Sequence, residues 1–206
     1  MKYNVVISGV GGQGLITLGR LIGEACIIRG VDVSIAEVHG MSQRGGSVVV
    51  HVRLGEGESP IIPLGSAHHL IALELIEAGR SVVYAGKDAV FSVNDFLWPP
   101  PLARYPSREE IINGLSNLGH KVVVVDANQL SSKITGSPIS SNIAMLGVAL
   151  GVDKRLEELI SLDAAQRAIE KYFKDPWREA NIKVLQEGYR IGLQQRGQQN
   201  KTRTLI

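Results

Sequence analysis

The chain has 206 residues, of which 44% are hydrophobic and 20% charged, and its formal net charge at pH 7 is +2. A mean hydropathy of +0.08 excludes an intrinsically disordered chain, and this length is enough for one domain with a hydrophobic core. The near balance of 22 basic and 20 acidic residues gives no general attraction to nucleic acid or membrane. We expect one domain over residues 1–206, with a flexible polar tail at 194–206.

The single cysteine, Cys26, excludes a disulfide within the chain. It lies in an apolar pattern with helical spacing, so we expect a buried, unreactive thiol. An iron–sulfur cluster needs about four cysteine ligands, and a structural zinc site needs about four Cys or His ligands. The five histidines show no such spacing, and no metal site is predicted. No apolar run reaches the ~18 residues of a membrane span, so a cytoplasmic location is expected.

The first half of the chain alternates strand and helix patterns. Residues 4–8 are a short apolar run typical of a buried parallel strand. Leucines at helical spacing, ending at Arg29 and Gly30, predict a helix over 15–29. Strands are predicted at 33–38 and 47–54, and without a helix between them they should pair antiparallel. The next predicted elements are a helix over 67–78 and strands at 81–85 and 89–93, joined by a turn at 86–88.

The second half of the chain changes character after one more strand. The proline-rich segment 97–107 predicts an extended connector, and Ser107 and Glu110 have the spacing of a capping box. Residues 121–126 are a valine-rich strand. The remaining predicted elements are helices over 143–150, 164–173 and 177–192, the last opened by Asp175 as N-cap and Pro176 as first helical residue.

A glycine-rich loop separates the first predicted strand from the first helix. Its glycines, in the pattern G-x-G-x-x-G, are Gly9, Gly11, Gly12 and Gly14, with Gln13 before the last. Backbone N–H groups in such a loop, together with the positive end of the following helix, attract phosphate. For NAD, the second strand should also supply an acid, and Glu37 has about that spacing. Tight packing of strand on helix would equally explain the glycines.

A second candidate segment, residues 40–47, follows the next strand. It contains Ser42, Arg44, Gly45 and Gly46, and we expect it to lie beside the glycine loop at one edge of the sheet. That carboxyl edge is where open α/β sheets bind ligands, and Arg44 is a donor for a carboxylate or phosphate. A flexible connection with a solvated arginine is the alternative interpretation.

Familiar catalytic motifs are missing from the sequence. It contains no G-x-S-x-G elbow, no Walker A motif and no H-E-x-x-H. No nucleophile and base with suitable spacing can be paired, and we assign no catalytic residue. This favours a binding module or a subunit whose reactive cofactors lie on another chain.

Two motifs carry a family resemblance: residues 6–14 (Val-Ile-Ser-Gly-Val-Gly-Gly-Gln-Gly) and residues 37–48 (Glu-Val-His-Gly-Met-Ser-Gln-Arg-Gly-Gly-Ser-Val). Together they resemble the gamma-domain family of 2-oxoacid:ferredoxin oxidoreductases, and within it the beta subunits that act on indolepyruvate. The likeness continues at 72–74, 142–147 and 181–188. The alternation of elements and this resemblance predict an α/β fold, with a Rossmann-like, mixed but mainly parallel sheet flanked by helices and a helical C-terminal third.

The resemblance implies a reaction shared between subunits. An arylpyruvate is decarboxylated oxidatively with coenzyme A, giving an aryl-acetyl-CoA, carbon dioxide and reduced ferredoxin. Thiamine diphosphate, magnesium and the iron–sulfur clusters are implied to lie on a larger alpha subunit, which agrees with a chain that has one cysteine. This chain would close and shape the site, with Gly9, Gly11–Gly14, Ser42 and Arg44–Gly46 facing an anion or the partner.

Three alternatives stay open from the sequence. The chain could be the gamma subunit of a pyruvate or 2-oxoglutarate ferredoxin oxidoreductase. It could be a free-standing NAD(P)-binding Rossmann protein, supported by the glycine pattern and Glu37. It could also be a regulatory module without enzymatic activity. Substrate preference and the stoichiometry of a complex are not readable from the sequence.

Overall fold

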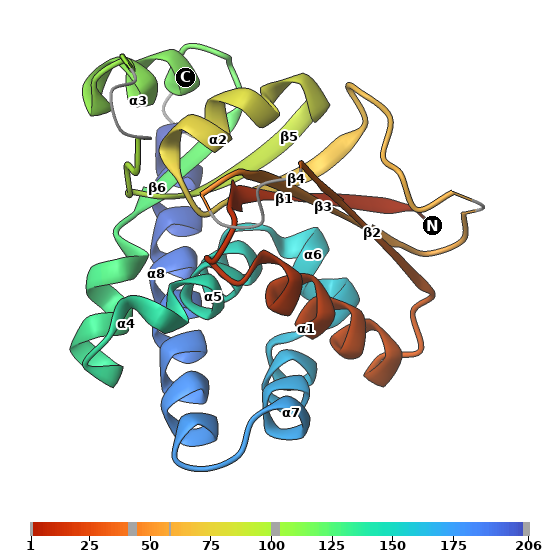
Figure 1. Cartoon of the computed structure of the whole chain (residues 1–206). Helices are drawn as coiled ribbons and strands as arrows, with labels where there is room; N and C mark the ends of the chain where they lie inside the picture. The colour runs from red at the N-terminus through yellow and green to blue at the C-terminus, as the bar shows by residue number, and fades with distance from the viewer. Residues whose placement is uncertain (1, 41–44, 58, 100–103, 204–206) are drawn as a thin grey trace.

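The computed structural model describes residues 2–40, 45–57, 59–99 and 104–203. These residues form one six-stranded sheet with helices on both faces (Figure 1). The strands are β1 (Tyr3–Val10), β2 (Val33–His39), β3 (Ser47–Leu54), β4 (Ala67–Ala72), β5 (Ala85–Asn94) and β6 (Lys121–Val125). The α-helices are α1 (Leu15–Ile28), α2 (Leu75–Ser81), α3 (Arg108–Ser116), α4 (Ala127–Thr135), α5 (Ser141–Val152), α6 (Lys154–Ile160), α7 (Leu162–Tyr172) and α8 (Trp177–Arg203).

The sheet has the strand order β2-β3-β1-β4-β5-β6. Strands β1, β4, β5 and β6 pair in parallel, whereas β3 is antiparallel to both β1 and β2. The predicted mixed, mainly parallel sheet and the predicted antiparallel pair are therefore confirmed. Because β3 lies between β1 and β2, strand β2 is at the edge of the sheet and does not neighbour β1.

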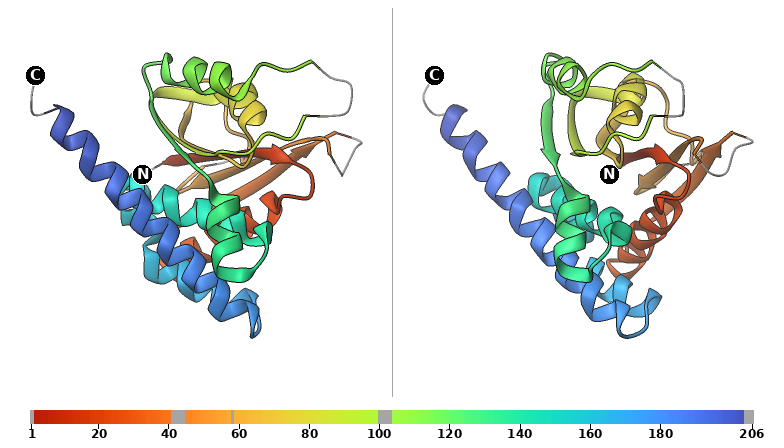
Figure 2. Two further views of the ribbon diagram at one scale, coloured as in Figure 1. Left: turned by 90° about the vertical axis from the view of Figure 1, so that its left-hand side faces the viewer. Right: turned by 60° about the vertical axis from the view of Figure 1, so that its left-hand side comes forward.

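Two helical layers cover the sheet, one on each face. Alternate side chains of β1 pack against one layer and then the other. Val5 and Ile7 face the larger core, which α1, α5, α6, α7 and α8 complete. Val6 points to the opposite face and packs in the smaller core under α2 and α3. Figure 2 shows α8 as the outermost helix, with its C-terminal end reaching beyond the sheet. Among the described residues, no helix combines the length and the apolar character of a membrane span.

The helix predicted over 67–78 is wrong. Its first part is strand β4, and only Leu75–Ser81 is helical, as α2. Leu70, Ile71, Ala72 and Leu73 are all fully buried, because β4 is a central strand covered on both faces. The run from Leu70 to Leu73 is apolar at every position, so it lacks the alternation of a half-exposed strand and can be mistaken for part of a buried helix.

The hairpin predicted over 81–93 is also wrong. Ser81 ends α2, a 3-10 turn spans Val82–Tyr84, and β5 runs from Ala85 through the expected turn to Asn94. Residues 86–88 have turn composition because the β4–β5 pairing is irregular there. Glycine and aspartate can mark a bulge as well as a hairpin turn.

The C-terminal third is helical, as predicted, but its helices differ in number and length. Helices α4 and α6 are absent from the prediction, and α8 continues through the polar segment after 192 as far as Arg203. Helix α8 begins at Trp177, as the range 177–192 predicts, so Pro176 precedes the helix and is not its first residue. The expected capping box is confirmed, since Ser107 and Glu110 satisfy each other at the start of α3.

Helices α5 and α8 are in direct backbone contact through four glycines. A Cβ atom on Gly147 or Gly151 of α5 would lie 2.2 or 2.4 Å from a carbonyl oxygen of α8. A Cβ atom on Gly188 or Gly192 of α8 would lie 2.3 or 2.4 Å from a carbonyl oxygen of α5. Both helices thus use glycines four residues apart, and any side chain at these positions would push them apart.

A buried polar network crosses the larger core beside β1. The Asp153 carboxylate accepts hydrogen bonds from the Tyr3 hydroxyl and from Nδ1 of His69, at 3.0 Å for the latter. Nε2 of His69 lies 2.9 Å from the Ser92 hydroxyl. Burial alone would raise the pKa of Asp153, but the bonds from His69 and Tyr3 outweigh it and hold this pKa below its ordinary value of 3.8. The network fixes the start of β1 to β4 and to α6.

Replacing Gly188 with alanine should destabilise the fold through steric overlap between α8 and α5. We expect Gly188→Ala to lower the free energy of unfolding by about 3 kcal/mol. Gly197 lies on the same helix, and a Cβ atom there would have no neighbour within 4 Å, so Gly197→Ala is the matched control. It should leave stability unchanged or raise it by up to about 1 kcal/mol. Chemical denaturation of both variants measures the difference, and equal effects would contradict the packing argument.

Replacing Asp153 with asparagine should weaken the fold in a pH-dependent way. The folded-state pKa is depressed, so the carboxylate contributes fully above pH 3.8 and loses this contribution as the pH falls further. We expect Asp153→Asn to cost about 3 kcal/mol at neutral pH and progressively less in acid. Urea denaturation between pH 7 and pH 2 tests this, with the exposed Asp163 as the site of a control substitution. A loss that does not vary with pH would refute it.

Candidate functional site

The glycine loop connects the carboxyl end of β1 to the start of α1. Gly12 and Gly14 have φ angles of 106° and 76°, which L-residues with side chains rarely adopt. The N–H of Gln13 donates to the carbonyl of Val10 at 3.1 Å and closes a tight turn. Gly14 then caps α1, and no side chain caps this helix start or places an acid in its first turn. The first N–H groups of α1 are therefore available to an anion.

Gln13 holds the loop in place with both ends of its amide. Its Oε1 accepts from the N–H of Val10 at 2.7 Å, and its Nε2 donates to the carbonyl of Leu73 at 2.9 Å. A Cβ atom on Gly9 would lie 2.7 Å from that Oε1, so Gly9 leaves room for the amide. Gln13 therefore has a structural role through its side chain, which ties the loop to Leu73. Gly9 has one because it lacks a side chain that would collide with Gln13.

The two predicted loops lie side by side, as the sequence indicates. The N–H of Gly11 donates to the carbonyl of Gly46 at 2.9 Å, and the N–H of Gly45 donates to the carbonyl of Gly11 at 3.3 Å. Gly45 has a φ of 75°. Ser42 and Arg44, the polar members of this predicted site, lie outside the described residues. The backbone pairing nevertheless places both glycine segments at one edge of the sheet.

A cleft of about 560 Å³ opens between the glycine loop and the helical third. Three asparagines and four aromatic residues contribute to its walls, a mixture of apolar surface and amide groups typical of ligand sites. Trp98 and Trp177 are each about half exposed at its rim. The lining residues include Gly12, Gly14, Phe96, Trp98, Asn128, Asn142, Phe173, Trp177 and Asn181.

Asn142 joins the cleft to the glycine loop. It lies at the start of α5, and its Nδ2 donates to the carbonyl of Gly14 at 3.0 Å. A Cβ atom on Gly14 would lie 2.5 Å from that nitrogen. On the neighbouring helix, Oδ1 of Asn181 accepts from the Ser140 hydroxyl at 2.6 Å. The buried Asn142, at the start of the mainly apolar α5, thus fixes the loop and lines the cleft.

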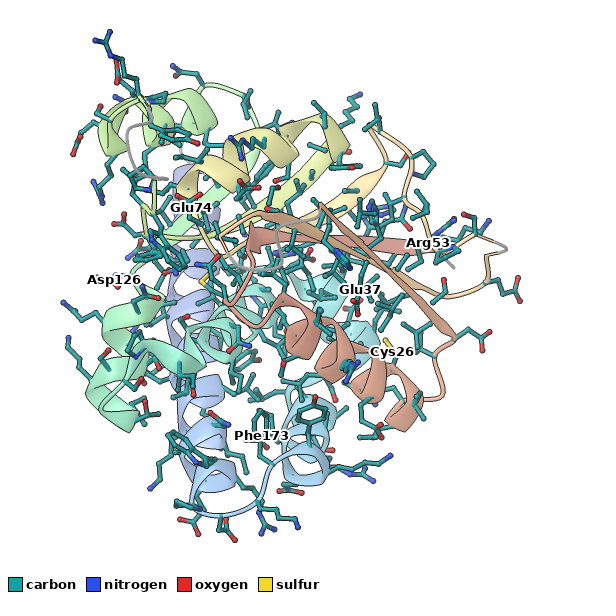
Figure 3. The ribbon with its side chains drawn as sticks, in the orientation of Figure 1. Cys26, Glu37, Arg53, Glu74, Asp126 and Phe173 are labelled. Carbon is teal, nitrogen blue, oxygen red and sulfur yellow. The ribbon has the colours of Figure 1, made fainter. Side chains whose placement is uncertain are left out.

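Glu74 positions the segment that carries Trp98. Its two carboxylate oxygens accept from the N–H groups of Trp98 at 3.0 Å and of Glu77 at 2.9 Å. Burial raises the pKa of Glu74 although these hydrogen bonds oppose the shift. Figure 3 labels Glu74, Asp126 and Phe173, and the first two lie on the side where the parallel strands end. Asp126 is occupied there as the cap of α4, accepting from the N–H of Gln129.

Glu37 does not lie where a dinucleotide site needs its acid. It is exposed on β2 and pairs with Val50 of β3, so a whole strand separates it from β1 and the glycine loop. In dinucleotide-binding folds the acid-bearing strand neighbours the first strand. The spacing in sequence is right, but the antiparallel β3 takes the neighbouring position.

Sequence reasoning misses the contribution of the C-terminal third to the site. It does not single out Asn142, Asn181, Trp98 or Trp177 as ligand-binding residues. One signal is available: Asn142 directly precedes the apolar run 143–150, and a polar residue buried with that run must find partners. Cys26 is fully buried as expected, and burial raises its pKa to about 12. Among the described residues, no three His, Cys, Asp or Glu side chains gather as a metal site would require.

The family model for pyruvate ferredoxin/flavodoxin oxidoreductases matches residues 4–191. This chain belongs to that family. The match covers the sheet, the glycine loop and the cleft, and it ends within α8.

Relatives of known name support this membership over most of the chain. Indolepyruvate oxidoreductase subunit IorB of Archaeoglobus fulgidus is 36% identical over 194 residues, which are 92% of this chain and 94% of that one. The common gamma subunit of the pyruvate/ketoisovalerate oxidoreductases of Pyrococcus abyssi is 26% identical over 184 residues, covering 88% and 92%. The solved 2-oxoglutarate:ferredoxin oxidoreductase of Magnetococcus marinus, bound to 2-oxoglutarate, coenzyme A and succinyl-CoA, shares the fold. Its TM-score is 0.69 at 16% identity, over 93% of this chain and 31% of that one.

Replacing Gln13 with alanine should loosen the glycine loop without removing a ligand group. The N–H of Val10 would lose its partner, and we expect the free energy of unfolding to fall by about 1–2 kcal/mol. Hydrogen exchange should accelerate at Val10 and Gly12 more than elsewhere in β1. The control is Gln129→Ala, which removes an exposed amide side chain whose oxygen accepts from Nζ of Lys133. Unchanged exchange in the loop would show that Gln13 does not hold it.

Proposed function

We propose that this chain is the beta subunit of an indolepyruvate:ferredoxin oxidoreductase. In this role it contributes to the coenzyme A-dependent oxidative decarboxylation of arylpyruvates to aryl-acetyl-CoA, with reduction of ferredoxin. The supporting observation is the 36% identity to IorB over 92% of this chain and 94% of that one. Identity to the pyruvate/ketoisovalerate gamma subunit is 26%, which makes a gamma subunit of that kind the second candidate.

We propose that the electron-handling groups lie on a larger partner subunit. An iron–sulfur cluster needs about four cysteines, and the chain has only Cys26, which is buried in the core. The residues of this chain therefore do not fit such a cluster. Thiamine diphosphate and its magnesium are placed on the same larger subunit, where the oxoacid would be decarboxylated. The match of this chain to 31% of a larger oxidoreductase chain supports a domain that works against other parts of one enzyme.

The cleft and the glycine loop suit coenzyme A or part of it. The uncapped start of α1 offers N–H groups to a phosphate, and the aromatic side chains offer apolar surface for the rest of the molecule. The predicted ligand set of Gly9, Gly11, Gly12, Gln13, Gly14, Ser42, Arg44, Gly45 and Gly46 stays a proposal. In it, Gln13 and Gly9 act by shaping the loop, and the backbone of Gly12 and Gly14 faces the ligand.

This chain's own residues would exclude water and orient the reactants. Trp98 and Trp177 form the rim of the cleft, and Glu74 fixes the backbone that carries Trp98. A partner seated against these rings would close the cleft, and desolvation there strengthens the hydrogen bonds that hold a ligand. We place the complex in the cytoplasm, and we take residues 1–206 as a single domain, of which the family model matches 4–191.

Reconstitution tests the proposed function directly. The chain co-expressed with a larger, cysteine-rich partner should reduce ferredoxin from indolepyruvate in the presence of coenzyme A, and neither subunit should do so alone. Pyruvate or 2-oxoglutarate as the preferred substrate would favour the gamma-subunit candidate. Reduction of ferredoxin by the isolated chain would overturn the proposed division between subunits.

Truncating Trp177 should impair turnover in that complex. We expect Trp177→Ala to lower kcat/KM for coenzyme A by about tenfold or more, because the rim loses a half-buried aromatic surface. Leu64→Ala removes an exposed apolar side chain outside the cleft and should change kcat/KM less than about twofold. Steady-state kinetics and co-purification of both complexes separate loss of turnover from loss of assembly. An unchanged kcat/KM for Trp177→Ala would show that the cleft does not bind coenzyme A during turnover.

A further inference from the structure

A second cavity, of about 430 Å³, lies at the amino edge of the sheet. This is the opposite end of the parallel strands from the glycine loop, because its walls include Asn4 at the start of β1 and His68 at the start of β4. The irregular part of β5 and Arg155 of α6 complete it. The proposed function uses none of these residues.

The wall formed by β5 departs from regular pairing. Ala67 pairs with Ala85, and the next pair is His69 with Val90, so β4 advances by two residues (69 − 67) while β5 advances by five (90 − 85). The extra residues leave the hydrogen-bonded ladder and border the cavity. Gly86 allows this path, since a Cβ atom there would lie 2.9 Å from the carbonyl oxygen of Ala67.

His68 offers the cavity a fixed hydrogen-bond donor. Its Nδ1 accepts from the backbone N–H of Asn4 at 2.9 Å, so in the neutral ring the proton resides on Nε2. Burial, with the nearby Arg155 charge, lowers the pKa of His68. The ring stacks on Tyr3, with centroids 4.9 Å apart. At neutral pH this histidine is an uncharged donor held in one orientation.

Two cations border the same cavity and have no carboxylate partner among the described residues. Lys87 belongs to the irregular part of β5, and the Arg155 guanidinium lies 5.4 Å from the centre of the Tyr3 ring. One acid, Asp88, also lines the cavity, so the lining side chains carry one net positive charge. The Asp153 carboxylate, whose charge also acts on His68, accepts hydrogen bonds from Tyr3 and His69. Asn4 is 7% exposed, and its Oδ1 has no hydrogen-bond partner although its Nδ2 donates to Ser66. The unsatisfied atom is an acceptor, so it suits a ligand that also carries an O–H group, and the two cations supply the attraction for an anion.

We propose that this cavity binds a tetrahedral oxyanion, namely phosphate, either free or as the end of a larger metabolite. The donors come from three separate segments, at His68, Lys87 and Arg155, which suits an anion that accepts hydrogen bonds from several directions. A planar carboxylate is more often held by two parallel N–H groups of a single arginine. The site lies apart from the glycine loop, and it stands whether or not the proposed function is correct.

Titration of the full chain with inorganic phosphate, followed by calorimetry and by amide NMR, tests this site. We expect saturable binding at millimolar phosphate, with shifted resonances at Gly65 and Gly86. Arg155→Gln should weaken binding by about tenfold, as expected for loss of a charged donor. The matched control is Lys154→Gln, which removes the same charge from the neighbouring residue outside the cavity and should change affinity less than about twofold.

The other outcomes identify the source of the phosphate or overturn the site. Binding of ADP that is at least about tenfold tighter than phosphate, and equally sensitive to Arg155→Gln, would assign the site to a phosphorylated metabolite. Equal affinities would assign it to free phosphate. Shifts confined to Gly11–Gly14, an absence of saturation, or equal effects of the two substitutions would refute the amino-edge site. The glycine-loop outcome would leave the proposed function intact.

Discussion

Helices α5 and α8 pack backbone against backbone, and the candidate site depends on that contact. Gly147 and Gly151 on one helix and Gly188 and Gly192 on the other leave no space for a Cβ atom. All of α5 is buried, so the helix has no exposed face and must be enclosed by its neighbours. Helix α8 supplies the cover on the side that faces away from the sheet. The four glycines therefore determine how closely α8 packs on α5.

The same contact determines where the cleft lies. Helix α5 presents Asn142 to the carbonyl of Gly14, and α8 brings Trp177 and Asn181 to the opposite wall. The glycine loop is then held from three directions, by Gln13 bonding to Leu73, by Asn142, and by the backbone of Gly46. A displacement of α8 would move α5, and with it the hydrogen bond from Asn142 to the carbonyl of Gly14. The loop is consequently a rigid part of the site, although it is rich in glycine.

Much of the fold and about half of the site are readable from the sequence, and the failures have physical causes. The glycine pattern between a strand and a helix is local, so the sequence predicts the loop together with its neighbour at Gly45 and Gly46. Strand β4 resembles a helix in sequence because Leu70 to Leu73 are buried on every side, which removes the alternation that distinguishes a strand. Glu37 has the right spacing for a dinucleotide site, but its strand β2 does not lie beside β1. Spacing along the sequence does not determine the order of strands in the sheet. Asn142 and Asn181 reach the cleft through long-range packing that no local pattern encodes.

The order of synthesis gives the α5–α8 contact a further consequence. Helix α5 emerges from the ribosome before α8, and it is apolar on all its faces. Until α8 follows, its glycine-lined surface has no cover, and the larger core cannot close. During the last part of translation, therefore, the apolar surface of α5 stays exposed to water until the C-terminal helix has been synthesised.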